Sequence, residues 1–305
     1  MKKLLLALLS LGLFASSCKK NDSIEKPAAE GKKVAIKISV ADFLQQVENL
    51  PSAHGRLANH ATNRDSLQNK VSDIYYFIQN TSEMGYVIRY QSQNVIRDGV
   101  NFGTLKDSLL PGDYKVYLAA SSKALNLHQA AGYGFEFERT SYDPCPEVFA
   151  QSLSIHVTPE GGASTINVGL NRIVARLEVN LLDGSVADSS VRVTMQSENP
   201  KYNFLTGEPE LAYGSDLRID LSKQNPQTYS DLVLNTATPF TVTISYIDKN
   251  TLQPATKVVE HVRCYKNKKT TLTGYLYNPP QPSGNRGFVI DLNLPWETDG
   301  PSQDF

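Results

Sequence analysis

Residues that commonly build catalytic and metal centres are scarce in this 305-residue sequence, which contains three cysteines and five histidines. It has no Cys-x-x-Cys, no closely spaced histidine pair, no H-E-x-x-H and no G-x-S-x-G. Its paired glycines do not precede a helix that could hold a phosphate group. We therefore predict a protein that is not an enzyme, with no catalytic residue, no metal site and no cofactor.

An excess of positive charge is also lacking. The chain has 30 Lys and Arg residues and 31 Asp and Glu residues, which gives a formal net charge of −1. No long basic run stands out. Because non-specific binding to nucleic acid depends on clustered Lys and Arg side chains, we expect no nucleic-acid partner.

The apolar run at the start of the chain is too short for a comfortable membrane span. It extends from Leu4 to Ala15, follows Lys2 and Lys3, and is interrupted by Ser10 and Gly12. A spanning helix needs about 20 apolar residues. A positive leading edge before a short apolar segment is the form of a secretion signal. We predict that residues 1–17 are a signal peptide that is removed.

Cys18 follows three small residues, Ala15, Ser16 and Ser17. This stretch resembles the lipobox of bacterial lipoproteins, which implies that Cys18 is acylated and becomes the first residue after cleavage. Fatty chains contribute about 0.8 kcal/mol per buried methylene, so several of them hold a protein durably at a membrane. Residues 18–33 are polar, and this composition predicts a flexible tether. The alternative is an ordinary signal peptide with an incidental cysteine.

Cys145 and Cys264 are the remaining cysteines. An exported compartment would permit a disulfide between them. Two cysteines in a sequence do not show that they meet, and two separate thiols are the favoured interpretation.

Alternation of apolar and polar residues recurs along the chain and indicates strands. Tyr114, Val116 and Leu118 alternate with polar neighbours in "GDYKVYLAAS", and "GYGFEFERT" and "RIVARLEVNL" alternate in the same way. Short helices are expected only at 41–50 and 119–131. Many brief strands with half-polar patterns predict an all-β protein made of antiparallel sandwiches.

The length is enough for two domains of ordinary size. We expect a division near residue 170, into an N-terminal β-sandwich at 34–170 and a C-terminal one at 171–305. No Pro-rich linker separates them, so firm contact between them is expected. The longest loop-like stretch, 51–70, is expected to be functional or mobile.

Several stretches together resemble one family. They are "SSCKKND", "KKVAIKISV", "VSDIYYFIQNTSEMGYVIRY", "NFGTLKDSLLPGDYKVYLAAS", "NVGLNRIVARLEVNL" and "GFVIDLNLPWE". In their order they are similar to the FimB-like fimbrial subunits, the fimbrillin-associated anchor proteins of Bacteroidetes, over residues 33–296. The resemblance implies two tandem transthyretin-like β-sandwiches, lipid-anchored at the outer membrane and at the cell surface. It also implies a fimbrial anchor or minor subunit whose partners are other fimbrial subunits and outer-membrane lipid.

In that family a strand from one subunit completes the sheet of the next, which is β-augmentation. The first strand here is expected at 34–40. Shaft subunits of the family lose this strand by cleavage after an arginine, and Arg56 and Arg64 lie in the corresponding loop. Anchor members keep the strand, so we expect retention.

The closing strand is the second segment that could be exchanged between subunits. Its apolar row consists of Phe288, Ile290, Leu292, Leu294 and Trp296. This row could fill a groove of a neighbouring subunit, or it could simply complete its own sheet, which is the favoured interpretation.

A lipid-anchored carbohydrate-binding β-sandwich protein is the alternative function. The same architecture and the 15 tyrosines motivate it. A row of exposed aromatic side chains on one sheet face would favour this alternative, and a closed apolar sandwich would not.

Overall fold

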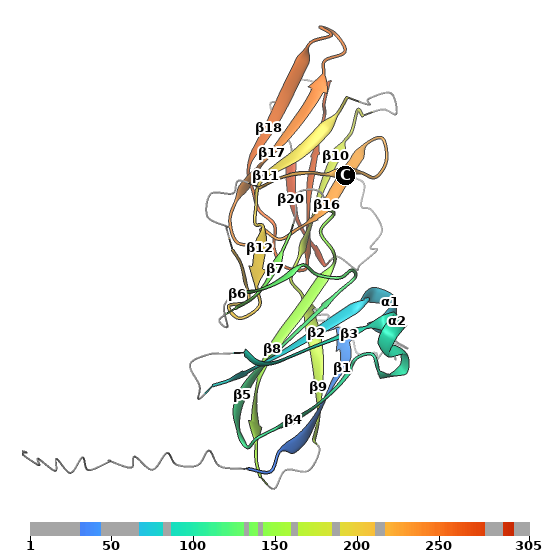
Figure 1. Cartoon of the computed structure of the whole chain (residues 1–305). Coiled ribbons are helices and arrows are strands. Elements are labelled where there is room, and N and C mark those ends of the chain that lie inside the picture. The colour runs from blue at the N-terminus through green and yellow to red at the C-terminus, as the bar shows by residue number, and fades with distance from the viewer. Residues whose placement is uncertain are drawn as a thin grey trace, which may run out of the picture.

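The computed structural model describes residues 31–43, 67–81, 87–130, 134–139, 143–159, 164–184, 190–210, 217–277 and 289–295. Strands dominate these residues, and two sandwiches are stacked end to end in an elongated molecule (Figure 1). The predicted all-β class is confirmed. No helix in the described ranges is long and apolar enough to cross a membrane. The predicted signal peptide, Cys18, Arg56 and Arg64 lie outside the described residues.

The first sandwich contains seven strands. They are β1 (Val34–Phe43), β2 (Asp73–Asn80), β3 (Val87–Asn94), β4 (Thr104–Leu109), β5 (Gly112–Ser121), β8 (Val148–Val157) and β9 (Ser164–Arg172), in the order β3-β2-β5-β8-β9-β1-β4. β9 pairs with β8 only through Arg172 and Asn171, and it runs parallel to β1 over most of its length. The chain therefore passes from one layer to the other along β9.

Alternate residues of these strands fill the first core. Ile36, Ile38, Ile74, Val116 and Leu118 are all at most 5% exposed and belong to one cluster drawn from both layers. Short helices α1 (Leu67–Lys70) and α2 (Val95–Asp98) and the 3₁₀ turn η1 (Gly99–Asn101) lie together beside this sandwich (Figure 1). The alternation read from the sequence thus corresponds to one buried face per strand.

The second sandwich has two sheets. One has the order β15-β16-β10-β19-β20 and the other β14-β11-β17-β18. The bounds are β10 (Ala175–Leu181), β11 (Arg192–Glu198), β14 (Leu217–Asp220), β15 (Ser222–Lys223), β16 (Thr228–Val233), β17 (Phe240–Ile247), β18 (Pro254–Val262), β19 (Lys268–Gly274) and β20 (Val289–Pro295). As in the first sandwich, the opening strand, β10, pairs in parallel with a late strand, β19.

A small third sheet joins the two halves of the chain. It consists of β6 (Leu127–Ala130), β7 (Gly134–Glu138), β12 (Lys201–Asn203) and β13 (Glu208–Glu210), in the order β13-β12-β7-β6. β7 and β12 pair directly, with Tyr202 opposite Phe137. Main-chain hydrogen bonds therefore connect segments from before and after residue 170.

The helix predicted at 119–131 is wrong. Ala119 and Ala120 end strand β5, where they pair with both β2 and β8, and β6 follows at Leu127. Ala119 and Ala120 belong to different apolar clusters on opposite faces of the sheet. Burial on both faces outweighs the helix propensity of alanine. The helix predicted from residue 41 is also wrong for residues 41–43, which continue β1, while 44–50 lie outside the described residues.

Candidate functional site

Strand β1 is held from both sides. It pairs with β4 in antiparallel fashion and with β9 in parallel. Val34, Ile36, Ile38 and Val40 are each at most 9% exposed and lie in the first core. Loss of this strand would therefore break two ladders and open an apolar groove in the sandwich.

Strand β20 contains Ile290, Leu292 and Leu294. Among the described residues it is paired on one side only. It pairs with β19 in antiparallel fashion, with Ile290 opposite Leu272, and forms the edge of its sheet. In this structure the closing strand completes its own sheet. Phe288 and Trp296, the ends of the predicted apolar row, lie outside the described residues.

Three charged side chains are buried where the sandwiches meet. Arg139 Nη1 donates to Glu198 Oε2 at 2.9 Å, and Arg139 Nη2 donates to Asp231 Oδ2 at 3.3 Å. The exposed fractions of these side chains are 1%, 0% and 9% for Arg139, Glu198 and Asp231. We call this set the ionic junction, because Arg139 follows β7 while its partners come from β11 and β16.

A β-bulge directs Glu198 into the ionic junction. The register of β11 against β14 shifts between Met195 and Glu198, and Ser197 has φ 59°. The extra residue brings Glu198, in place of Ser197, to the buried side. There Glu198 Oε1 accepts hydrogen bonds from the backbone N–H groups of Asn199, Leu234 and Asn235.

Burial shifts the pKa values of the ionisable side chains in and near the ionic junction. It raises the pKa of Glu198 and that of Asp231, and the Arg139 guanidinium opposes both shifts. The nearby Cys145 thiol is also buried, which raises its pKa to about 12. A thiol with that pKa is protonated at neutral pH and is a poor nucleophile.

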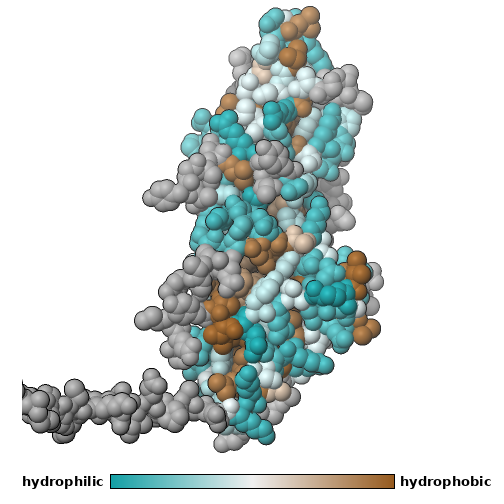
Figure 2. Space-filling model, viewed as in Figure 1, coloured by the Kyte–Doolittle hydropathy of each residue, from teal (hydrophilic) through white to brown (hydrophobic). Residues whose placement is uncertain are grey.

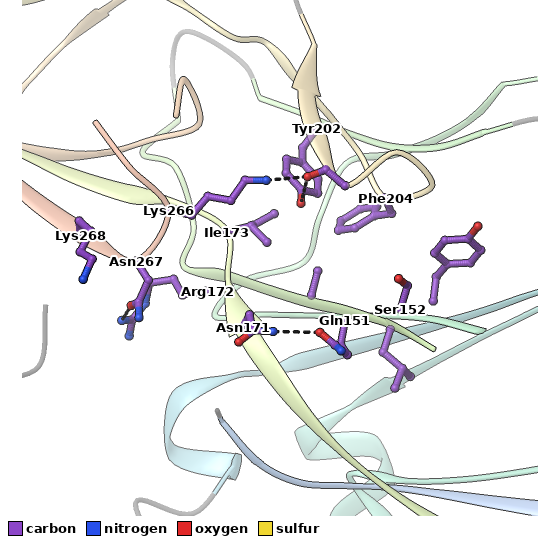
Figure 3. Close-up of a pocket in the computed structure, with 14 residues that line it drawn as sticks. Gln151, Ser152, Asn171, Arg172, Ile173, Tyr202, Phe204, Lys266, Asn267 and Lys268 are labelled. Atoms are coloured by element: carbon purple, nitrogen blue, oxygen red, sulfur yellow. Dashed lines mark hydrogen bonds between the residues drawn. The ribbon is translucent and has the colours of Figure 1, made fainter. Parts of the chain in front are cut away.

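A cavity of about 460 Å³ is lined by segments of both sandwiches and of the third sheet, and we call it the junction cavity. Its lining comes from β5, β8, the end of β9 with the residue that follows it, β12 with its following turn, and the start of β19 with the turn before it. The polar lining residues include Gln151, Asn171, Arg172, Lys266 and Lys268 (Figure 3). Figure 2 shows apolar surface about midway along the molecule. The volume lies in the range of about 300–1,000 Å³ usual for ligand sites.

Neighbouring side chains position two of the cations in the junction cavity. Arg172 Nε donates to Glu147 Oε1 at 2.7 Å, and Arg172 Nη1 donates to Asn267 Oδ1 at 2.7 Å. Lys266 Nζ donates to the Gly207 carbonyl oxygen at 2.7 Å and lies 5.7 Å from the ring centre of Tyr202. The cavity is therefore built by fixed contacts that span both sandwiches.

Comparison with known proteins gives structural relatives only. No family model matches the chain, and neither does any curated protein. A candidate polysaccharide-binding protein from Bacteroides thetaiotaomicron aligns with TM-score 0.52 at 7% identity, over 79% of this chain and 92% of that chain. A candidate cell adhesion protein from Bacteroides uniformis aligns with TM-score 0.51 at 10% identity, over 86% of this chain and 97% of that chain. The chain shares their fold.

A tip fimbrial protein from Porphyromonas gingivalis, with a C-terminal truncation, is a more distant match. It aligns with TM-score 0.45 at 11% identity, over 85% of this chain and 99% of that chain. At identities this low the likeness concerns the fold alone.

The other side chains singled out in the sequence are dispersed. Cys145 and Cys264 are free and buried, in agreement with the favoured interpretation of two separate thiols. His128 and His156 each pair at 2.6 Å with a carboxylate, from Glu138 and Asp113. His261 is exposed on β18, and His54 and His60 lie outside the described residues.

Aromatic side chains form no continuous exposed platform in the described residues. The tyrosines with the most exposed surface are Tyr90 on β3 and Tyr265 and Tyr275, which flank β19. Tyr117, Tyr202 and Phe204, which line the junction cavity, are each at most 5% exposed. Sequence reasoning missed this cavity, because its residues come from segments far apart in the chain.

Proposed function

We propose that this protein is a lipid-anchored cell-surface subunit, a fimbrial anchor or minor subunit, that assembles with other subunits through an exchanged strand. The observation that carries the proposal is the contrast between β1, paired on both sides, and β20, paired on one side at a sheet edge. An edge strand can leave or extend its ladder at lower cost than an interior strand. On this basis β1 is retained and β20 is the strand that engages a neighbour.

The adhesion-type fold supports the surface role. Two structural relatives with TM-scores above 0.5 are described as candidate polysaccharide-binding and cell adhesion proteins. The attachment part of the proposal depends on Cys18 and the small residues before it. We expect the acylated Cys18 to hold the protein at the outer membrane, with residues 19–33 as the tether.

The strand mechanism is tested with two engineered disulfides. Thr271 lies opposite Asp291 across β19 and β20, and Lys37 lies opposite Lys106 across β1 and β4. Directly opposed residues on adjacent strands are the positions at which a disulfide can form with acceptable geometry. The Thr271→Cys/Asp291→Cys variant should remain on the membrane and be absent from filament fractions until a reductant is added.

The Lys37→Cys/Lys106→Cys variant is the matched control and should assemble like the wild type. Wild-type incorporation of the β19–β20 disulfide variant would refute exchange of the closing strand. A block caused by the β1–β4 disulfide would show instead that β1 is the strand that leaves.

Anchoring is tested separately with Cys18→Ser. The variant should move from the membrane fraction to the soluble fraction, while Cys264→Ala, which removes a buried thiol, should stay with the membrane. Equal recovery of the Cys18→Ser protein in membranes would contradict lipid attachment at this residue.

A further inference from the structure

The charged side chains among the described residues that line the junction cavity are all positive. Arg172, Lys266 and Lys268 contribute positive charges, and none of the described residues that line the cavity is acidic. The charges of Arg172 and Lys266 are balanced from outside the lining, by Glu147 and Glu208. Lys268 is exposed and forms no ion pair with any described residue. The cavity therefore favours a ligand that carries a negative charge.

The same wall offers both hydrogen-bond donors and acceptors. Asn171 Nδ2 donates to Gln151 Oε1 at 2.9 Å, an interaction visible in Figure 3. Gln151 Nε2 and Asn171 Oδ1 have no hydrogen-bond partner in the part of the chain that the structure describes. Asn267 uses its Oδ1 to accept from Arg172, which leaves its Nδ2 as a donor. Hydroxyl groups both donate and accept, so this set of amides suits a polyhydroxylated ligand.

Aromatic side chains form another part of the wall. Tyr117, Tyr202 and Phe204 are buried against the sandwiches and line the cavity. The hydroxyl groups of Tyr117 and Tyr202 already donate, to Gln79 Oε1 and to the Gly207 carbonyl oxygen. Because each of the three side chains is at most 5% exposed, they contribute a tightly packed apolar base to the cavity and little accessible ring surface.

We infer that the junction cavity binds a sugar that carries a carboxylate. The carboxylate lies at Lys268, where a charge-assisted hydrogen bond forms. The sugar hydroxyls exchange hydrogen bonds with Gln151, Asn171 and Asn267. The source of the sugar can be a uronic acid of a polysaccharide or a sialic acid of a glycoprotein, which present the same group to the cavity.

This inference deepens the adhesion role and rests on the proposed function for its biological meaning. Its measurement does not depend on anchoring or on strand exchange, because purified protein without filaments is sufficient. Failure to bind sugar would not change the results of the disulfide and Cys18 tests. Failure of those tests would not change the measured binding of sugar by the cavity.

The purified mature chain is titrated with galacturonic acid, glucuronic acid and N-acetylneuraminic acid, and binding is measured by calorimetry or ligand-observed NMR. Glucose, galactose and inorganic phosphate are the comparison probes. At least one acidic sugar should bind at least about tenfold more tightly than every neutral sugar, as expected from one charge-assisted hydrogen bond. Inorganic phosphate should not displace it at equal concentration. Tighter binding of a uronic acid would identify a polysaccharide as the source of the sugar, and tighter binding of N-acetylneuraminic acid would identify a glycoprotein.

Two variants locate the site. Lys268→Gln should weaken acidic-sugar binding about tenfold or more, and Asn171→Asp, which adds a negative charge to the wall, should abolish it. The matched control is Lys106→Gln, which removes an exposed positive charge on β4 and should bind like the wild type. Thermal unfolding of each variant checks that the fold is kept.

Three results would overturn the inference. They are equal binding of neutral and acidic sugars, displacement by phosphate at equal concentration, and absence of binding by every sugar. Unchanged affinity in folded Lys268→Gln and Asn171→Asp proteins would equally refute the location of the site.

Discussion

The sandwich cores and the ionic junction are both buried, but they are built from different chemistry. The two cores consist of aliphatic and aromatic side chains from alternate strand positions. The junction instead buries Arg139, Glu198 and Asp231 beside a third apolar cluster. Hydrophobic burial is non-directional, whereas a hydrogen-bonded ion pair demands a particular geometry. The cores therefore stabilise each sandwich, and the junction ties the segment after β7 to β11 and β16 of the second sandwich.

Removal of Arg139 should have the largest effect. Arg139→Met leaves Glu198 buried without its cation, and losing one partner of a buried pair costs about 3–5 kcal/mol. Urea unfolding followed by fluorescence measures the change in the free energy of unfolding. The control is Arg192→Met, which breaks an exposed pair with Asp220 and should change stability little.

The double variant Arg139→Met/Glu198→Gln sharpens this test. With the Glu198 carboxylate replaced by a neutral amide, one of the two buried charges that lost Arg139 is removed while that of Asp231 remains, so part of the lost stability should return. A single variant as stable as the wild type would show that the ionic junction does not stabilise the fold.

The sequence predicted the cores far better than the junction. Period-two alternation predicted strands such as β5, β7 and β10, because a strand with one buried face alternates apolar and polar residues. The burial of Glu198 cannot be recognised from alternation in the sequence, since the bulge at Ser197 changes which residue faces inward. Arg172 stands at a polar position of the alternation in "RIVARLEVNL", yet it is 7% exposed and pairs with Glu147 and Asn267.

The junction cavity could not be predicted for a related reason. Gln151, Asn171 and Lys266 come from three separate segments, and their meeting depends on how the two sandwiches are stacked. No local pattern encodes that arrangement. The first and closing strands, by contrast, were recognisable as strands from their apolar rows, and the structure pairs both within this chain.

Truncations in the two cores should have the next largest effects. Ile38→Ala in the first core and Leu177→Ala in the second should each cost about 2–5 kcal/mol. The two residues belong to separate clusters and are 1% and 0% exposed. Because they share no contacts, the double variant should equal the sum of the single variants within about 0.5 kcal/mol. A coupling well above that value, measured in urea, would show that the cores do not act independently.

A smaller change is expected at the aromatic wall. Tyr202→Phe removes the hydrogen bond from the tyrosine hydroxyl to the Gly207 carbonyl oxygen, which spans 2.8 Å. The net loss should be about 0.5–1.5 kcal/mol. Tyr265→Phe, at an exposed ring, is the control and should have no measurable effect. Equal stability of wild type and Tyr202→Phe would show that the turn at Gly207 is held by other contacts.

The smallest effect should come from the exposed pair of Arg192 and Asp220. A side-chain hydrogen bond from Arg192 holds the pKa of Asp220 below its usual range. A carboxyl group with a lowered folded-state pKa contributes stability above its unfolded pKa, about 3.9, and loses it as pH falls through the folded value. The difference in unfolding free energy between wild type and Asp220→Asn should therefore be small at pH 7 and should shrink below about pH 4. If this difference grew on acidification, the folded protein would prefer protonated Asp220. The exposed pair would then not differ from the ionic junction in the way that burial predicts.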